Sequence, residues 1–404
     1  MRPRLLFLTH RLPYAPNRGD RIRAFHLLRA LTRLADVQVV ALTHDADEDS
    51  HVKDLSSTVD AIWTARVPHT RNRLRAAMAL AGSTPLTHVL LDSPRLAEAI
   101  ASAVSRVRPD VVYAYCSGIA PVALAPPLDA IPLIADLVDV DSQKWRDLAT
   151  DASAWRAAIY RREATTLAGF EVRLASRARS TFVVSERERD VFPDRQLAQG
   201  LSVIPNGIDV AHFAPSADSH RRSNSVVFTG VFDYAPNETG ARWLIESVWP
   251  QVRRRVPSAT LTLAGASPTT RLRNAAAGDS SIEITGAVPD IRPYLWRATV
   301  AAAPVFVSRG VQNKVLEALA AGLPCATTSA VLDGLPVVAR AGCLAADEAA
   351  PFADALVTLL EESDADRQRR VDAAEISSLG WDRMLGALAG HVERAAAAQS
   401  ATHR

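Results

Sequence analysis

The sequence predicts an α/β protein built from two doubly wound, Rossmann-like parallel-sheet domains. A chain of 404 residues is too long for one ordinary domain and suits two domains of roughly 200 residues each. In both halves, short apolar runs alternate with segments of helical periodicity, which is typical of parallel strands joined by helices. Near residue 203 the chain becomes rich in Pro, Gly, Asn and Ser, which indicates a linker.

The first half opens with a strand–helix–strand unit. Apolar runs at residues 5–9 and 37–42 favour two buried parallel strands. Between them we expect a helix from about Asp20, a plausible N-cap, to Leu34, because apolar residues recur there at three-residue steps. Further strands are expected at residues 110–116, 131–140 and 180–185, with one long helical stretch over residues 143–178.

The second half repeats this alternation. Strands are expected at residues 225–230, 260–265, 282–287, 300–305 and 324–329, and helices near residues 237–255, 290–298 and 311–321. The expected domains are therefore residues 1–203 and 204–380, followed by a helix over residues 381–404 that can pack back on the first domain. In each domain the ligand-binding loops should lie at the carboxyl ends of the strands.

The composition is that of a globular protein. Hydrophobic residues make up 48% and charged residues 22% of the chain, which excludes a disordered protein. The formal net charge of +2 settles nothing about partners. Arginine-rich runs occur at residues 70–75, 160–163 and 253–255, and each is either a solvated face or a contact for an acidic partner such as a lipid headgroup.

Cysteine usage and the chain start favour a cytoplasmic protein. Cys116, Cys325 and Cys343 have no metal-binding spacing, so we expect small thiols in a reducing compartment, with two of them buried in strand-like runs. The first apolar run ends before Thr9 and is too short for a secretory signal. No apolar run reaches the length of about 18 residues that a membrane-spanning helix needs.

One helix start carries an unusual set of polar residues. A helix opening at Gly310 would expose unpaired N–H groups and the positive end of its dipole, which suits a phosphate or carboxylate. Asn313, Lys314 and Glu317 would share one face of that helix. The alternative is that Lys314 and Glu317 form an ordinary solvated pair.

Glycine turns follow several of the expected strands. Gly19, Gly230 and Gly310 each lie at such a position, where a ligand can approach the backbone closely. None of the three belongs to a G-x-G-x-x-G motif. The absence of this dinucleotide fingerprint after the first strand argues against hydride transfer.

Several segments in order along the chain carry a resemblance. The second half resembles the nucleotide-binding domain of family 4 retaining glycosyltransferases. The whole chain from Leu5 to about Trp381 looks like the sugar transferases associated with bacterial PEP-CTERM/exosortase exopolysaccharide loci. The segments that carry this likeness are FLTHRLPYAPNRGDRIRAFHLLRAL, YAYCSGIAP, ADLVDVDSQKW and RGVQNKVLEALAAGLP.

The resemblance implies the GT-B fold, in which two Rossmann-like domains face a central cleft. It also implies transfer of a sugar from a nucleotide-sugar donor to a glycan or polyprenyl-linked acceptor, without metal or other cofactor. The expected partners include no nucleic acid, and a peripheral contact with the cytoplasmic face of the inner membrane is compatible with the family. The alternatives are a nucleotide-sugar 2-epimerase of the same fold and a non-catalytic nucleotide-binding module.

The resemblance also assigns roles on the donor side. Glu317 matches the carboxylate that accepts hydrogen bonds from the ribose hydroxyls of the nucleotide, and Lys314 would meet the diphosphate. Val288 would flank the base, and Gly19 would admit the donor phosphates. Gly230, Gly310 and Asn313 complete the expected donor-binding set.

The chain departs from the family pattern at two of these positions. Family members usually carry Glu eight residues before the ribose carboxylate, whereas this chain has Arg309. The basic residue often found after the first strand of the second domain is also missing, and Asn237 is the polar residue offered there. We therefore expect Arg309 and Lys314 to share the neutralisation of the diphosphate charge. The alternative for Arg309 is a salt bridge to a neighbouring acid.

Acidic residues after a central strand of the first domain are the acceptor-side candidates. Asp139 and Asp141 form a D-x-D pair, which binds a divalent metal in the other glycosyltransferase fold. The second domain argues against a metal site, because it resembles that of GT-B enzymes, which use helix ends and cations in place of the metal. We expect Asp139 to orient the acceptor or transfer its proton, with helix capping as the alternative for Asp141. His10, just after the first strand, is a further candidate.

Overall fold

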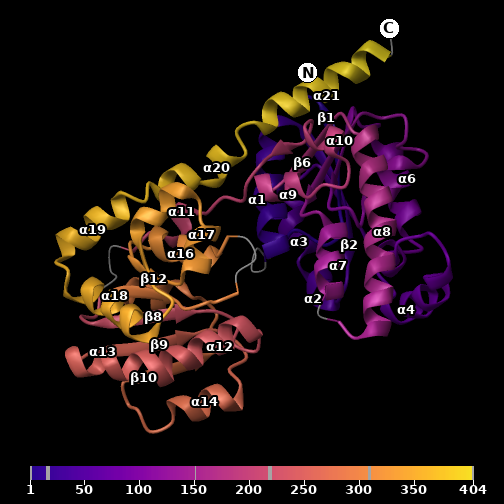
Figure 1. The fold of residues 1–404 in the computed structure, drawn as a ribbon. Coiled ribbons are helices and arrows are strands. Elements are labelled where there is room, and N and C mark those ends of the chain that lie inside the picture. The colour runs from indigo at the N-terminus through magenta and orange to yellow at the C-terminus, as the bar shows by residue number, and fades with distance from the viewer. Residues whose placement is uncertain (1, 15–18, 151, 217–220, 308–310, 403–404) are drawn as a thin grey trace. The chain divides into compact units, whose positions relative to one another are not determined.

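The computed structural model describes residues 2–14, 19–150, 152–216, 221–307 and 311–402. The chain divides into two compact units (Figure 1). Unit 1 contains Met1–Gly207 and Met384–Arg404, and unit 2 contains Ile208–Arg383. Unit 2 is thus inserted between two separate parts of unit 1.

The described residues of unit 1 form a seven-stranded parallel sheet of order β3-β2-β1-β4-β5-β6-β7. This confirms the predicted α/β class with its parallel sheet. The strands are β1 Arg4–Thr9, β2 Asp36–Thr43, β3 Ala61–Arg66, β4 Val111–Tyr115, β5 Leu133–Val138, β6 Ser180–Val183 and β7 Ser202–Val203. The sequence prediction missed the edge strands β3 and β7, which lack the continuous burial of the central strands.

Helices connect the parallel strands of unit 1. They are α1 Gly19–Leu34, α2 Ala46–Ser50, α3 Val52–Ser56, α4 His69–Met78, α5 Leu86–Leu90, α6 Leu96–Arg106, α7 Asp141–Thr150, α8 Ala154–Arg177, α9 Glu186–Asp190, α10 Arg195–Ala198 and α21 Leu388–Thr402. The prediction of one long helix over residues 143–178 was wrong. The chain reverses between α7 and α8, and the ring of Trp145 packs 5.1 Å from that of Tyr160 across the hairpin.

Unit 2 contains a second parallel sheet, six-stranded in the described residues, of order β10-β9-β8-β11-β12-β13. Its strands are β8 Ser225–Thr229, β9 Thr260–Ala264, β10 Ile282–Gly286, β11 Val300–Ala303, β12 Cys325–Thr327 and β13 Cys343–Ala345. Its helices are α11 Val210–Phe213, α12 Ala235–Trp243, α13 Trp249–Arg255, α14 Thr270–Ala276, α15 Arg292–Arg297, α16 Asn313–Ala320, α17 Ser329–Gly334, α18 Ala349–Glu361, α19 Asp364–Asp372 and α20 Trp381–Met384. A π-helical segment, Leu244–Val248, joins α12 to α13.

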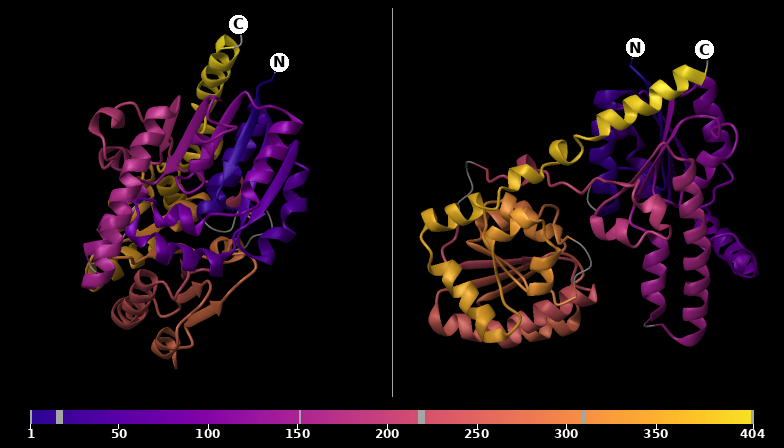
Figure 2. Two further views of the ribbon diagram at one scale, coloured as in Figure 1. Left: turned by 90° about the vertical axis from the view of Figure 1, so that its right-hand side faces the viewer. Right: turned by 45° about the horizontal axis from the view of Figure 1, so that its top comes forward.

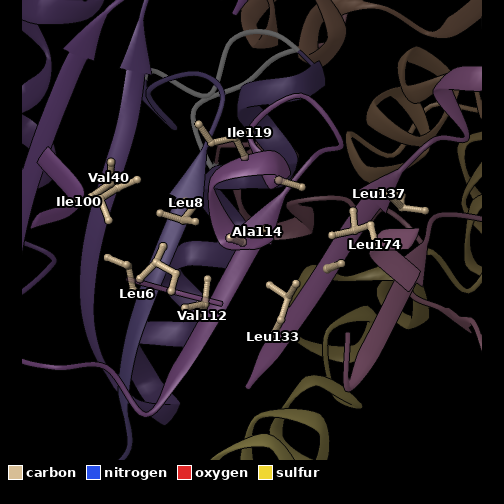
Figure 3. Close-up of a cluster of buried hydrophobic side chains, with 14 of the residues drawn as sticks. Leu6, Leu8, Val40, Ile100, Val112, Ala114, Ile119, Leu133, Leu137 and Leu174 are labelled. Atoms are coloured by element: carbon tan, nitrogen blue, oxygen red, sulfur yellow. The ribbon is translucent and has the colours of Figure 1, made fainter. Parts of the chain in front are cut away.

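The core of unit 1 is a layer of aliphatic side chains between the sheet and its helices (Figure 3). Leu6 and Leu8 alternate along β1 and lie on the same face as Val112 of β4. Ile100 of α6 and Leu174 of α8 belong to the same buried cluster, with Ile100 beside Val40 and Leu174 beside Leu137 (Figure 3). Full burial of such a side chain stabilises the fold by about 1.5–3 kcal/mol. The buried layer therefore holds the central strands in place, and with them the polar residues at their carboxyl ends.

The last helix of the chain belongs to unit 1. The ring of His391 on α21 packs edge-on against Phe182 at 4.8 Å, and its Nδ1 lies 2.7 Å from Oγ of Ser180. Leu388 and Val392 of α21 are buried. The right view of Figure 2 shows α21 lying across unit 1. Among the described residues, no helix combines the length and the apolar character needed to cross a membrane.

Candidate functional site

Helix α16 of unit 2 begins at Asn313, three residues later than the predicted opening at Gly310. Arg309 and Gly310 lie outside the described residues. The helix is held against the sheet by Val315, Leu316 and other apolar residues that are buried along its length. This packing leaves Asn313, Lys314 and Glu317 on the half-buried polar side.

Lys314 is fixed by contacts from two other elements. Its Nζ donates a hydrogen bond of 2.6 Å to Oδ1 of Asn237, near the start of α12. The ammonium also lies 4.8 Å from the ring centroid of Phe228 on β8, at cation–π distance. Asn237 in turn donates from Nδ2 to the backbone carbonyl of Val231, 2.9 Å away. The structure therefore brings together the turn after β8 and the starts of α12 and α16.

The charges of Lys314 and Glu317 are both disfavoured by their surroundings. Burial lowers the pKa of the Lys314 ammonium to about 8, although the nearby Glu317 carboxylate opposes the shift. Burial raises the pKa of the Glu317 carboxyl to about 7, again opposed by its neighbour. Both side chains are half-buried, so they are not a fully solvated surface pair. Perturbed pairs of this kind are common at ligand-binding sites.

Two glycines shape the backbone beside Lys314. A Cβ on Gly230 would lie 3.0 Å from Nδ2 of Asn237 and 3.4 Å from Nζ of Lys314. Gly265, at the end of β9, has φ +148°, and a Cβ there would lie 1.9 Å from the carbonyl oxygen of Gly230. The sequence prediction included Gly230 but missed Gly265. The sequence shows a glycine after Leu263 and Ala264, but it does not show that this glycine approaches the turn at Gly230.

The remaining donor-side candidate lies at the same edge of the sheet. Val288 is half-buried in the turn after β10. A cavity of about 10 Å³ lies beneath α16, lined in part by Val227, Lys314 and Val315. This space holds roughly one water molecule and is too small for a nucleotide. The edge formed by the strand ends is therefore the place where a ligand would contact Lys314.

In unit 1, the turn that carries Asp139 has strained backbone. Val138 has φ +66°, a left-handed conformation that is costly for a β-branched residue. Its N–H donates to Oδ1 of Asp136 at 3.0 Å, and its carbonyl accepts from the N–H of Val184 at 2.9 Å. Cys116, at the end of the adjacent strand β4, also has positive φ, +71°. Such strain persists only where neighbouring contacts over-determine it.

Asp136 is the anchor of this turn and was missed by the sequence prediction. Its Oδ2 accepts from Nη2 of Arg23 at 2.9 Å and from the hydroxyl of Tyr113 at 3.0 Å. All three side chains are buried. The only sequence signal was an acidic residue inside an apolar run, which indicates a buried charge that needs a partner.

Two glutamates, and not Asp141, accept the hydrogen bonds of the backbone N–H groups at the start of α7. The N–H of Val140 donates to Glu188 at 2.6 Å, and the N–H and hydroxyl of Ser142 donate to Glu171 at 3.1 and 2.5 Å. Burial raises the pKa of Glu171 to about 7. Asp141 instead accepts a 2.5 Å hydrogen bond from the hydroxyl of Ser117. The capping role that was the alternative for Asp141 is therefore carried by two other residues.

Asp139 is exposed to solvent directly after β5. Even so, the surrounding protein reduces its hydration and raises its pKa, and the negative charge of Asp141 acts in the same direction. A raised pKa makes a carboxylate a better proton acceptor near neutral pH. Within the described residues, no group of three or more His, Cys, Asp and Glu side chains is arranged to hold a metal ion.

His10 lies at the carboxyl edge of the same sheet. Its ring stacks on Tyr115 with centroids 6.0 Å apart, and its carbonyl lies 2.9 Å from Nε2 of His44. Nearby, the buried carboxylate of Glu48 accepts hydrogen bonds from Arg11 and Arg21 at 2.5 and 2.7 Å. This cluster follows β1 and β2. The predicted phosphate-admitting residue Gly19 is the first residue of α1.

Each unit is a Rossmann-like parallel sheet covered by helices, and unit 2 carries a lysine and a carboxylate near the start of α16. Residues 223–362, most of unit 2, match the family model described as "Glycosyl transferases group 1". A search of curated proteins finds no match. The family match and the fold together support a glycosyltransferase of this group.

Solved structures share the fold over nearly the whole chain. Anabaena Alr3699/HepE in complex with UDP and glucose has a TM-score of 0.65 at 14% identity, covering 97% of this chain and 100% of that one. An α,α-trehalose 6-phosphate synthase from Burkholderia multivorans gives 0.61 at 14%, covering 98% and 99%. WaaG, a glycosyltransferase involved in lipopolysaccharide biosynthesis, gives 0.59 at 15%, covering 94% and 98%. These likenesses confirm the GT-B type of fold.

Proposed function

We propose that the protein transfers a sugar from a nucleotide-sugar donor to a glycan or polyprenyl-linked acceptor, with retention of configuration. The observation that carries the proposal is the ammonium of Lys314, held by Asn237 and Phe228 beside the carboxylate of Glu317. A cation at a helix start suits a diphosphate, and an ionised carboxylate suits ribose hydroxyls. The HepE structures with UDP and with UDP-glucose support this class of donor.

The main requirement of the reaction is stabilisation of the negative charge that develops on the leaving diphosphate. The bond between the anomeric carbon and the β-phosphate oxygen breaks, and the acceptor hydroxyl oxygen bonds to that carbon. Negative charge therefore builds on the leaving diphosphate, where Lys314 and the N–H groups of α16 would stabilise it. We propose that Asp139 orients the acceptor hydroxyl or takes its proton, as its raised pKa supports.

Arg309 is proposed to share this neutralisation with Lys314. An arginine cannot accept hydrogen bonds from sugar hydroxyls, unlike the glutamate usual in the family. If it stabilises the leaving group, Arg309→Ala should lower the chemical rate on the order of 10²–10³-fold while weakening donor binding far less. If it reads a carboxylate on the donor sugar, the same change should mainly relax discrimination against neutral sugars.

The setting proposed for this reaction is exopolysaccharide or cell-surface glycan biosynthesis in the cytoplasm. The resemblance of the sequence to transferases of such loci supports it. No cofactor is required by the proposal, because the nucleoside diphosphate is already an activated leaving group.

The proposal is tested by incubating the purified chain with a panel of nucleotide sugars and measuring slow donor hydrolysis, which requires no acceptor. We expect one donor to release nucleoside diphosphate and free sugar. Lys314→Ala should abolish this release, and Lys53→Ala, at an exposed position of unit 1, should not. Formation of a C2-epimeric nucleotide sugar would instead indicate an epimerase. Nucleotide affinity without turnover, also in the presence of polyprenyl-linked glycans, would indicate a binding module.

A further inference from the structure

Two neighbouring turns of unit 1 are joined by hydrogen bonds beyond the ends of their strands. One turn follows β5 and carries Asp139, and the other follows β6 and leads into α9. The N–H of Val184 donates to the carbonyl oxygen of Val138 at 2.9 Å. Two residues further along, the N–H of Val140 donates to Oε2 of Glu188 at 2.6 Å. Asp139 therefore lies between two residues whose backbone groups are held by the turn after β6.

Glu188 contacts the turn after β5 from the first turn of a short helix. Ser185 is the N-cap of α9, and its hydroxyl oxygen accepts from the N–H of Glu188 at 3.2 Å. The segment SERE at residues 185–188 has the spacing of a capping box, in which the glutamate usually accepts from the backbone N–H of the capping serine. Here the Glu188 carboxylate accepts from Val140, in another turn. A residue type that commonly caps its own helix thus fixes the neighbouring turn.

The turn that carries Asp139 needs such support. Val138 has φ +66°, which a β-branched residue adopts only where surrounding contacts impose it. Val140 is buried, so without Glu188 its N–H would lose a partner that water could not easily replace. Leu137, on the other side of the strained residue, belongs to the buried layer (Figure 3). The position of the exposed Asp139 is therefore set by its buried neighbours.

Asp139 and Glu188 also act on each other through charge. Burial raises the pKa of the Glu188 carboxyl, and the negative charge of Asp139 acts in the same direction. Repulsion between two like charges is mutual, so an ionised Glu188 also increases the proton affinity of Asp139. The other charged groups that act on one or both of these carboxyls are Asp136 on β5, Asp141 and Lys144 on α7, Arg23 on α1 and Arg187 on α9.

We propose that Glu188 is a positioning residue for Asp139, because its carboxylate holds the turn through the N–H of Val140 and keeps a negative charge beside Asp139. This inference rests on the proposed function, in which Asp139 orients the acceptor hydroxyl or takes its proton. The hydrogen bond fixes the place of Asp139, and the charge makes Asp139 a stronger proton acceptor. A purely structural role would need the hydrogen bond alone, which an uncharged amide oxygen also provides. The charge of Glu188 is therefore the property that separates the two roles.

The main test compares Glu188→Gln, whose amide oxygen can still accept from Val140, with the wild type. Donor hydrolysis, in which water takes the place of the acceptor, is measured against pH at saturating donor, so that weaker donor binding at low pH does not contribute. Without the charge of Glu188, Asp139 should stay ionised to lower pH. The acidic limb of kcat should then move down by roughly 0.5–1 pH unit, the effect of one like charge near the protein surface. Glu188→Ala also loses the hydrogen bond, and kcat should fall on the order of 10–10²-fold with little change in KM, because Asp139 is displaced.

A second measurement needs no turnover. The NMR signal of the Asp139 carboxyl carbon, assigned by its absence in Asp139→Asn, is followed against pH in the wild type and in Glu188→Gln. Its midpoint should fall by the same amount as the acidic limb of kcat. Glu186→Gln is the matched control, because Glu186 lies on the same helix, is 63% exposed and pairs with Arg189. This control should keep the wild-type titration and the wild-type pH profile.

The outcomes separate this inference from the proposed function. An unchanged midpoint and an unchanged acidic limb in Glu188→Gln would overturn the role of Glu188 and leave it a structural residue. A wild-type rate in Glu188→Ala would overturn its role in holding the turn. A wild-type rate in Asp139→Asn would remove Asp139 from the reaction, and both proposals for this turn would fail. Absence of hydrolysis in the wild type would contradict the proposed function alone, because the titration of Asp139 still shows whether Glu188 acts on it.

Discussion

Arg23 and Asp136 form an ion pair inside unit 1, with Nη2 2.9 Å from Oδ2 and exposed fractions of 1% and 0%. The other terminal nitrogen of Arg23 donates to the carbonyl of Ile204 and to Oδ1 of Asn206, both at 3.0 Å. Burial opposes the charge of Arg23, yet the carboxylate of Asp136 keeps its pKa raised. One ion pair thus joins α1, the strained end of β5 and the segment that leaves β7.

Asp136→Asn should destabilise the protein strongly. The amide has nearly the same shape but leaves Arg23 buried without a counter-charge, which typically costs about 3–5 kcal/mol. Urea unfolding would measure the loss. Asp49→Asn is the matched control, because Asp49 and its partner Arg66 are each nearly half exposed, and such a pair contributes at most about 1 kcal/mol. Similar small losses in both variants would contradict a structural role for the buried pair.

Glu317→Gln should weaken binding of nucleoside diphosphates by about 1–3 kcal/mol, the scale of a charge-assisted hydrogen bond lost in a partly buried site. Isothermal titration calorimetry provides the measurement. Glu246→Gln serves as the control, since Glu246 is exposed in unit 2 and pairs with Arg242 on its own helix face. Unchanged affinity of the Glu317 variant would remove this residue from the donor site.

Donor binding should be strongest between about pH 7 and pH 8. The pKa of Lys314 is about 8, so its positive charge is lost as pH rises through 8 and affinity for a diphosphate falls. The pKa of Glu317 is about 7, so its negative charge, which the ribose contact needs, is lost as pH falls through 7. Calorimetry from pH 6 to 9 would show this window. In Glu317→Gln the acidic limb should disappear, and its persistence would assign that limb to another group.

Gly265→Ala should disturb the turn beside Lys314. The added Cβ would come 1.9 Å from the carbonyl oxygen of Gly230, so that turn must move, and nucleotide affinity should fall together with stability. Gly278 provides the comparison, because it also has positive φ, +90°, but a Cβ there would meet no atom within 4 Å. Gly278→Ala should therefore cost only about 1 kcal/mol of backbone strain and leave binding intact. Equal binding by both variants would argue against the role of the Gly230 turn.

Turnover should survive EDTA, and donor affinity should be the same with and without Mg²⁺. The reason is that Lys314 and the start of α16 already offer positive charge to a diphosphate. Donor hydrolysis in the presence of chelator is the measurement. A strict requirement for Mg²⁺ or Mn²⁺ would instead make Asp139 and Asp141 the first residues to test as ligands.

The sequence predicted the central strands because each is a short, largely apolar run. It did not predict the reversal between α7 and α8, since Ala-rich segments continue helical periodicity through the turn. Strands β3 and β13 were also missed. Each is partly exposed along its length, so its apolar pattern is weaker than that of a central strand.

The candidate site was partly predictable for a similar reason. Lys314 and Glu317 are three residues apart on one helix, so local spacing alone places them together. The bond between Lys314 and Asn237 spans 77 positions, and the pair of Arg23 with Asp136 spans 113. Such contacts depend on which strands are neighbours, which a single sequence does not specify.

The return of the chain to unit 1 has a practical consequence for engineering. The buried residues Leu388 and Val392 of α21 pack in a domain whose other residues end at Gly207. Truncation after Arg383 would remove α21 from unit 1 and expose the apolar surface that this helix covers. By contrast, residues 208–383 form one uninterrupted cassette. Exchange of unit 2 between related chains therefore needs two junctions, one near residue 208 and one near residue 383, and both must leave the last helix with its own unit 1.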